Sequence, residues 1–451
     1  MTATCIGRHT ASTIALLAAL ALLAAGSAAP LRAQTDTAAD SSSGGFIEGI
    51  WTRDKLTGDW GGLRTDLGKH GIGIDLRFSQ FYQDVTSGGA DSGNNGAYGV
   101  KLDSFVNIDA QKLFGSWEGL SVSMHVETRA GDDVLGDAGA FVLPNSSLLY
   151  PLPGDYSGTQ VTGLFVNQAL FDGKAAVLAG KLNSFDLLQG MFPNITDYGL
   201  DGFMNANSMM SIVSWGRWLT LSQYGVAGWT IEGGMPSTGF IVTGTENTSD
   251  TWSNLKSSFD SGPGILAFHR FLYEIDSKQG YVYVGGGGST QSYDSTDPAD
   301  WTIVPGRGAT STGDGKAWGL AVYVSQNIWE DQKDDKRFVN VFFGGSRADN
   351  NVSFSDWDVF ANIQAFGLFD ARPNDRMGFG AHYYHLADNF VDTASTLPGV
   401  NLRGNFWTTE VYYNFEINPW LHLTPNFQYA QNENTSDDPA VILGARLVVD
   451  F

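Results

Sequence analysis

The amino-acid sequence predicts an all-β protein, a transmembrane β-barrel of antiparallel strands preceded by a short N-terminal helix. From residue 71 onward, apolar and polar side chains alternate in segments of about ten residues, the length of a tilted membrane crossing. After the first 33 residues, the chain has no apolar run long enough for a membrane helix. The last segment is amphipathic and ends on an aromatic residue, Phe451. Together these features favour a membrane barrel over a soluble sheet, whose strands average about five or six residues.

Composition and charge exclude several classes of protein. The 451 residues include 26 Lys and Arg against 48 Asp and Glu, which gives a formal net charge of −22. Because a nucleic-acid binder needs a basic surface, we expect no general nucleic-acid partner. A single cysteine excludes both a disulfide framework and a four-thiolate metal centre.

The first 33 residues have the layout of a secretory signal peptide. Residues 14–25 form an unbroken apolar run that is too short to span a bilayer, and small residues follow it. Cleavage after Ala28 and cleavage after Ala33 both fit this pattern. We expect residues 34–56 to be a flexible lead-in, and residues 57–451 to form the barrel with its short helix, which Asp59 would cap.

The alternation divides the side chains of each strand between two faces, because successive side chains point to opposite sides. In residues 120–129, for example, Val122 and Met124 share an apolar face that opposes His125 and Glu127. A membrane barrel turns its apolar face to lipid and keeps a polar lumen, whereas a soluble sheet buries its apolar face.

Connections and aromatic residues favour the membrane arrangement. Long polar segments at residues 87–96, 244–264 and 288–315 contrast with tight turns at 172–173 and 418–419, as in outer-membrane barrels. Within residues 186–264 the pattern does not define strand boundaries. Aromatic residues lie near expected strand ends, where the membrane interface favours them: Tyr82, Tyr98, Trp318, Trp357, Trp407 and Trp420.

Several motifs resemble those of the OprB-type carbohydrate-selective porins. Residues 57–64, Thr-Gly-Asp-Trp-Gly-Gly-Leu-Arg, resemble the N-terminal signature, and residues 180–183, Gly-Lys-Leu-Asn, resemble a motif at a strand end in mid-chain. The C-terminal signature is matched by residues 410–413, 418–421, 423–426, 428–429 and 440–447. The resemblance implies a 16-stranded barrel in the bacterial outer membrane, reached by export through the inner membrane. It also implies passive diffusion of sugars into the periplasm, with no cofactor.

The predicted lumen face carries charges of both signs beside aromatic rings. Such groups suit weak, reversible contacts with sugar hydroxyls and C–H faces, although they would equally keep the lumen wet and brace the wall. Arg129 and Glu127 lie beside residues 131–156, a segment long enough to fold into the lumen as a constriction. The candidate pore-lining or sugar-contacting residues are Arg77, Lys101, Asp103, His125, Glu127, Arg129, Lys181, Glu410, Tyr412 and Arg446.

We expect no enzyme activity, no catalytic residues and no metal site. Carboxylate pairs such as Glu410 with Glu416 could serve glycoside hydrolysis, but charges of a lumen wall account for them better. Residues 285–288, four glycines without the lysine and helix of a phosphate-binding loop, are interpreted as a flexible turn.

Two alternative functions remain open at this point. One is a general or ion-selective porin, and the other is a secreted all-β protein that binds or hydrolyses polysaccharides. The expected partners are sugars, outer-membrane lipid and the barrel-assembly machinery, which would recognise the closing strand that ends at Phe451. Both a monomer and a homotrimer are compatible with the sequence.

Overall fold

The structure is a computed structural model that describes residues 49–93, 96–139, 142–149, 157–194, 201–211, 217–251, 255, 257–304, 308–397 and 400–451. The expected signal peptide and most of the lead-in lie outside these residues.

As predicted, sixteen antiparallel strands form one closed barrel, which β1 (Ile72–Ser87) closes by pairing with β20 (Ala440–Asp450). The other wall strands are β2 (Ala97–Asp109), β3 (Leu120–Gly131), β4 (Gly158–Leu170), β5 (Ala175–Asn183), β6 (Ser222–Glu232), β7 (Met235–Gly244), β8 (Pro263–Ile275), β9 (Lys278–Ser289), β14 (Trp318–Glu330), β15 (Phe338–Ala348), β16 (Ser355–Phe366), β17 (Arg376–Leu386), β18 (Asn405–Asn418) and β19 (Leu421–Ala430).

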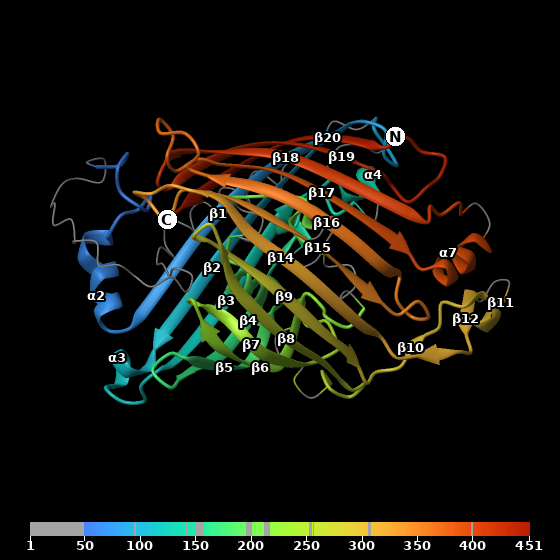
Figure 1. Cartoon of the computed structure of the whole chain (residues 1–451), viewed down its shortest axis with the longest axis horizontal. Helices are drawn as coiled ribbons and strands as arrows, with labels where there is room; N and C mark the ends of the chain where they lie inside the picture. The colour runs from blue at the N-terminus through green and yellow to red at the C-terminus, as the bar shows by residue number, and fades with distance from the viewer. Residues whose placement is uncertain are drawn as a thin grey trace, which may run out of the picture.

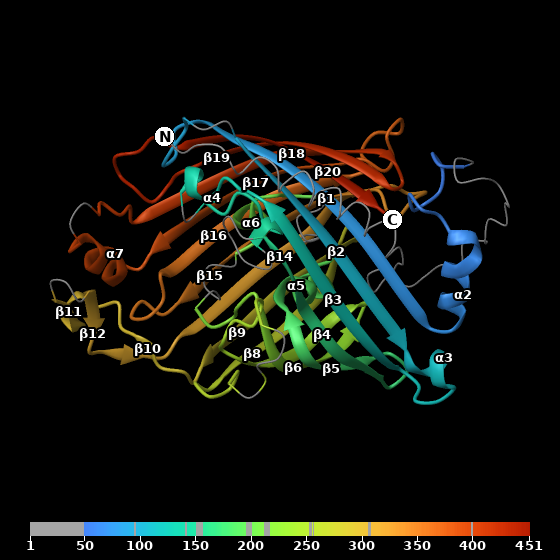
Figure 2. The same cartoon turned by 180° about the vertical axis from the view of Figure 1, so that it is seen from behind.

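The two ends of the barrel differ in the length of their connections (Figures 1 and 2). One end carries the N-terminal helix α2 (Leu63–Lys69) after a 3₁₀ turn, η1 (Trp60–Gly62), together with α3 (Ala110–Phe114) and turns as short as residues 233–234. The opposite end carries long connections with these elements: α4 (Leu135–Ala138), η2 (Ser147–Leu149), α5 (Ser184–Met191), α6 (Ala206–Met209), β10 (Tyr293–Asp294), η5 (Pro298–Asp300), β11 (Trp301–Val304), β12 (Gly308–Ser311), β13 (Asp314–Gly315) and α7 (Asp388–Ser395). In outer-membrane barrels the short turns face the periplasm.

The two strand faces have the polarity that the alternation predicted. Apolar side chains cover the outside of the wall, where Leu320, Val359 and Val411 are 56%, 50% and 48% exposed. The inward Tyr323 and Arg446 are 1% and 0% exposed. An apolar outer wall suits lipid, whereas a water-soluble sheet would bury these residues. In the described part of the chain, no helix is both long and apolar enough to span a membrane.

Two interpretations drawn from the sequence are wrong. Residues 285–288 are not a turn but the end of β9, where they pair with β8 and β14. A side chain at Gly287 would collide with the carbonyl oxygen of Ile265, so glycine allows the strands to approach there. Trp420 is not an interfacial residue: it is buried, stacks on Trp51 and donates a hydrogen bond to the carbonyl oxygen of Ile50 (2.6 Å).

The connection between β5 and β6 folds back into the barrel. We call its described residues 184–194 and 201–211 the lumen plug. The plug side chains Leu187, Met191 and Phe192 pack against inward-facing aromatic residues of the wall, including Tyr283 and Tyr323. One side of the lumen therefore holds a hydrophobic core, and buried polar side chains are frequent on β16–β20 and β1–β3.

Candidate functional site

Strand register brings four candidate residues together inside the lumen. Lys101 of β2 lies opposite Arg129 of β3, and Asp103 lies opposite Glu127. Because these positions are two residues apart along each strand, all four side chains point inward. Each is only 1–2% exposed, so each charge requires a partner.

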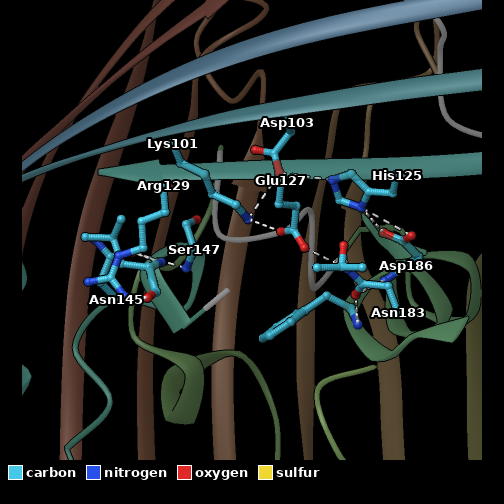
Figure 3. A network of polar contacts seen from close by, with 12 residues as sticks. Lys101, Asp103, His125, Glu127, Arg129, Asn145, Ser147, Asn183 and Asp186 are labelled. Atoms are coloured by element: carbon cyan, nitrogen blue, oxygen red, sulfur yellow. Dashed lines mark hydrogen bonds and ion pairs between the residues drawn. The ribbon is translucent and has the colours of Figure 1, made fainter. Parts of the chain in front are cut away.

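Lys101, Asp103, Glu127 and His125 form a network of ion pairs, and Arg129 lies beside it and pairs with Asp133 (Figure 3). The Lys101 ammonium lies 2.5 Å from Glu127 Oε1 and 3.1 Å from Asp103 Oδ1. His125 continues the network, with Nε2 3.1 Å from Asp103 Oδ1 and Nδ1 3.0 Å from Asp186 Oδ1. Asp186 belongs to α5, so the network connects the barrel wall to the lumen plug.

Three members of the network offer the donor atoms that metal ions prefer. Ligand atoms of Asp103, His125 and Glu127 lie within 4.8 Å of one another. A histidine nitrogen and two carboxylates could hold a divalent ion. However, the Lys101 ammonium already bonds to both carboxylates and offsets one of their two charges. A metal ion would have to displace it.

Asn183 explains why a Gly-Lys-Leu-Asn motif stands at the end of β5. Its Oδ1 accepts hydrogen bonds from the backbone N–H groups of Phe185 (2.9 Å) and Asp186 (3.3 Å), which caps α5. Its Nδ2 donates to Glu127 Oε2 (3.1 Å). The motif therefore starts the plug helix and ties it to β3, while Lys181 donates to the carbonyl oxygen of Thr251 (2.6 Å).

Arg129 holds the connection between β3 and β4. Its guanidinium donates to the carbonyl oxygen of Leu148 (2.6 Å) and to Asp133 Oδ2 (2.7 Å). The carbonyl oxygen of Pro144 accepts from Gln83 and Gln428 across the lumen. The described part of this connection thus enters the lumen, but the arginine fork that we expected to hold sugar hydroxyls is bonded to the protein.

Three other candidates hold the lumen plug from the far side. Glu410 accepts hydrogen bonds from the backbone N–H groups of Met204 (2.7 Å) and Asn205 (2.8 Å). Arg446 donates to the carbonyl oxygen of Gly202 (2.9 Å). The ring of Tyr412 meets Phe203 edge-on, with centroids 4.9 Å apart.

Arg77 is the most exposed of the ten candidates. Its guanidinium pairs with Asp450 (2.6 Å) and with Asp201 of the plug (3.5 Å), and its side chain remains 27% exposed. Lys55 and Asp75 form a further pair nearby in sequence (2.7 Å). Of the candidates, Arg77 offers the most surface to a passing solute.

Sequence reasoning missed these partners, of which Asn183 ends β5 and the others lie in the plug: Asn183, Asp186, Asp201 and Asn205. All but Asn183 fall within residues 186–264, where no strand period is visible. One local signal was available, because Asn183 followed three residues later by Asp186 is a helix-start pattern.

Comparison with known proteins assigns the family. The sequence profile described as "Carbohydrate-selective porin, OprB family" matches residues 93–451. The chain belongs to the OprB family of carbohydrate-selective porins. Porin B of Pseudomonas aeruginosa is 25% identical to this OprB-family porin over 430 residues, which cover 88% of this chain and 91% of that protein. The putative porin QuiX of Acinetobacter baylyi is 25% identical over 412 residues, covering 84% and 89%.

Solved structures agree with the barrel of this porin. The high-pH structure of Pseudomonas putida OprB superposes with a TM-score of 0.74 at 21% sequence identity, covering 89% of this chain and 99% of that one. The low-pH structure of the same protein gives a TM-score of 0.53 at 17% identity. At these identities the match shows a shared fold. As a member of a family of porins, which are channels, this β-barrel belongs in the outer membrane.

Proposed function

We propose that this porin lets small sugars diffuse passively into the periplasm, with no catalytic step and no cofactor. The observation that carries the proposal is the charge-paired lumen wall of β2 and β3, which also anchors two inward-folded connections. Paired charges of both signs offer donors and acceptors to a neutral polyol without creating a strong field for one ion. The name of the family and that of Porin B support the same reading.

The ten candidate residues divide into two roles in this proposal. The nearly inaccessible Lys101, Glu127 and Arg129 set the position of the inward-folded connections and so the width of the channel. Arg77, whose side chain is 27% exposed although its guanidinium pairs with Asp450 and Asp201, contacts the sugar directly. Arginine suits this role because it has five N–H donors, more than the pair with Asp450 uses, and stays charged at any working pH.

Sugar uptake by liposomes that contain the purified porin tests the function. We expect swelling in glucose and sucrose to exceed swelling in amino acids of similar size, and added sugar to reduce single-channel current. Equal permeation of sugars and amino acids would favour a general porin instead. Release of reducing sugar from polysaccharides by a protein without channel activity would favour the secreted enzyme.

Two substitutions separate the roles of the candidate residues. Arg77→Ala should weaken sugar block of the current more than it changes the open-channel current, although it also removes one of the cations that hold Asp201. Arg129→Ala should alter the open-channel current itself, because it frees the connection held at Leu148. If Arg77→Ala leaves sugar block unchanged, Arg77 is a wall charge and not a sugar contact.

Export and assembly complete the proposal. The signal peptide within residues 1–33 directs the chain through the inner membrane and is then removed by cleavage after Ala28 or Ala33. The closing strand β20, ending at Phe451, presents the chain to the barrel-assembly machinery. Mass analysis of the mature protein would identify the cleavage site, and cross-linking in intact cells would distinguish a monomer from a homotrimer.

A further inference from the structure

A cavity of about 410 Å³ lies between the lumen plug and the wall. Its plug side is formed by Leu187, Met191 and Phe192, and its wall side includes Ile241, Leu266 and Tyr283. The cavity is not sealed. Protein interiors are close-packed, and empty apolar space of this size destabilises a fold. A lining of this kind is typical of a small-molecule site.

One buried polar group on the cavity lining has a free hydrogen-bond donor. Gln223 is 0% exposed, and its Oε1 accepts hydrogen bonds from both the backbone N–H and the hydroxyl of Thr220 (2.9 Å each). Because a backbone N–H can only donate, these bonds identify the oxygen end of the amide. Its Nε2 has no hydrogen-bond partner among the described residues. A buried unpaired donor is costly unless a ligand oxygen completes it.

We propose that this cavity binds the apolar aglycone of small aryl or alkyl glycosides, with the linking oxygen accepting a hydrogen bond from Gln223 Nε2. This inference rests on the proposed sugar channel. A bare sugar does not suit the cavity, because most of its hydroxyls would be buried against carbon without partners. An aromatic aglycone fits a wall where Tyr283 meets Phe192 edge-on at 5.1 Å.

Block of single-channel current in planar bilayers tests the proposal, with phenyl β-D-glucopyranoside, glucose and phenol as probes. We expect the phenyl glucoside to block at a concentration at least about tenfold below that of glucose, because burial of a phenyl ring adds hydrophobic binding energy. Equal blocking concentrations for the two would overturn the proposal. So would phenol blocking as strongly as the phenyl glucoside, since the site would then serve free aromatic solutes.

Three substitutions locate the binding. Leu266→Trp narrows the cavity and should remove most of the advantage of the phenyl glucoside over glucose. Ile265→Trp is the matched control, because Ile265 is the residue before Leu266 and its side chain is 47% exposed on the outer wall. Gln223→Glu keeps an acceptor for Thr220 but places an oxygen where the donor was. It should therefore weaken block of the current by phenyl glucoside and leave block by glucose unchanged. It also provides the test if Leu266→Trp does not fold.

The outcomes separate this inference from the proposed function. If the unmodified porin does not let glucose through, the proposed sugar channel is refuted. Normal glucose permeation, with phenyl glucoside block unaltered by both Leu266→Trp and Gln223→Glu, would refute the aglycone site alone.

Discussion

The Lys101 ammonium bonds Glu127 at 2.5 Å, although the residue directly across the strand pair from Lys101 is Arg129. Two cations opposite each other repel, and the structure resolves this by turning them apart. Lys101 reaches diagonally to Glu127 and also contacts Asp103, while Arg129 turns to Asp133. One lysine thus pairs with two buried carboxylates in the lumen.

Replacing Lys101 should lower the stability of the barrel. Lys101→Met leaves Asp103 and Glu127 without their shared cation and should lower the free energy of unfolding by about 3–5 kcal/mol. Adding Glu127→Gln should restore part of the loss. Urea unfolding in lipid vesicles measures both effects. Lys112→Met is the control, because Lys112 is exposed on α3 and should change stability by less than about 0.5 kcal/mol. Similar values for Lys101→Met and Lys112→Met would contradict the role of this pair.

The lumen plug should loosen when Glu410 is removed. Glu410→Ala leaves the backbone N–H groups of Met204 and Asn205 without their acceptor, at a cost of about 1–3 kcal/mol each if they stay buried. We expect a larger and noisier single-channel current. Glu416→Ala provides the control, because Glu416 lies on the same strand and accepts a hydrogen bond from Asn374 at the short-turn end. An unchanged current in Glu410→Ala would show that the plug is held by its other contacts.

Arginine on the outer wall should destabilise the barrel in proportion to its depth in the bilayer. Val411, in the middle of β18, and Ile417, near its end, are 48% and 49% exposed to the outside. Val411→Arg should cost about 2–4 kcal/mol and Ile417→Arg about 0–1 kcal/mol. Equilibrium unfolding in vesicles measures the difference. Equal costs would mean that the membrane does not cover β18 as the apolar face implies.

Phe451, at the end of β20, should contribute to closure of the barrel. The backbone N–H of Phe451 donates to the carbonyl oxygen of Leu76 (3.0 Å), and Arg64 donates to the Phe451 carbonyl oxygen (2.9 Å). Deleting residues 441–451 removes the strand that closes the barrel and should abolish the heat-modifiable form, because an open edge cannot be left in lipid. Deleting Phe451 alone should reduce its yield, whereas Phe451→Tyr should preserve it. Normal heat-modifiable barrel without residues 441–451 would refute this view.

Acid should weaken the hold of Asp201 on the barrel wall. Burial by itself would raise the pKa of Asp201, but Arg77, His422 and the arginines 446 and 376 outweigh it and lower this pKa to about 2. A lowered pKa means that the stabilisation is complete above the ordinary value near 4 and is lost as the pH falls toward 2. The fraction of heat-resistant barrel should therefore fall between pH 4 and pH 2. In Asp201→Asn that fall should be shallower, with lower stability at pH 7, and identical acid profiles would contradict the assignment.

Periodicity in the sequence predicted most of the barrel wall because a strand carries its own evidence, but it did not define β6 and β7, which lie within residues 186–264. In β18, Val411 faces lipid and Glu410 faces the lumen simply because strand side chains alternate, whatever the neighbouring strands are. The same local rule predicted that Lys101, Asp103, Glu127 and Arg129 point inward. Resemblance to the OprB family added the number of strands, which alternation alone does not define.

Only the tertiary structure decided what those inward side chains do. Glu410 and the backbone of Met204 are 206 residues apart in sequence, and Arg129 bonds a carbonyl oxygen, a group that every residue possesses. Such contacts do not recur at a fixed spacing, and one partner is a backbone group that does not depend on residue type. The sequence pattern therefore cannot predict them. The plug, residues 184–194 and 201–211, is hydrophobic on the side that meets Tyr283 and Tyr323. It lines the lumen only because the closed wall surrounds it.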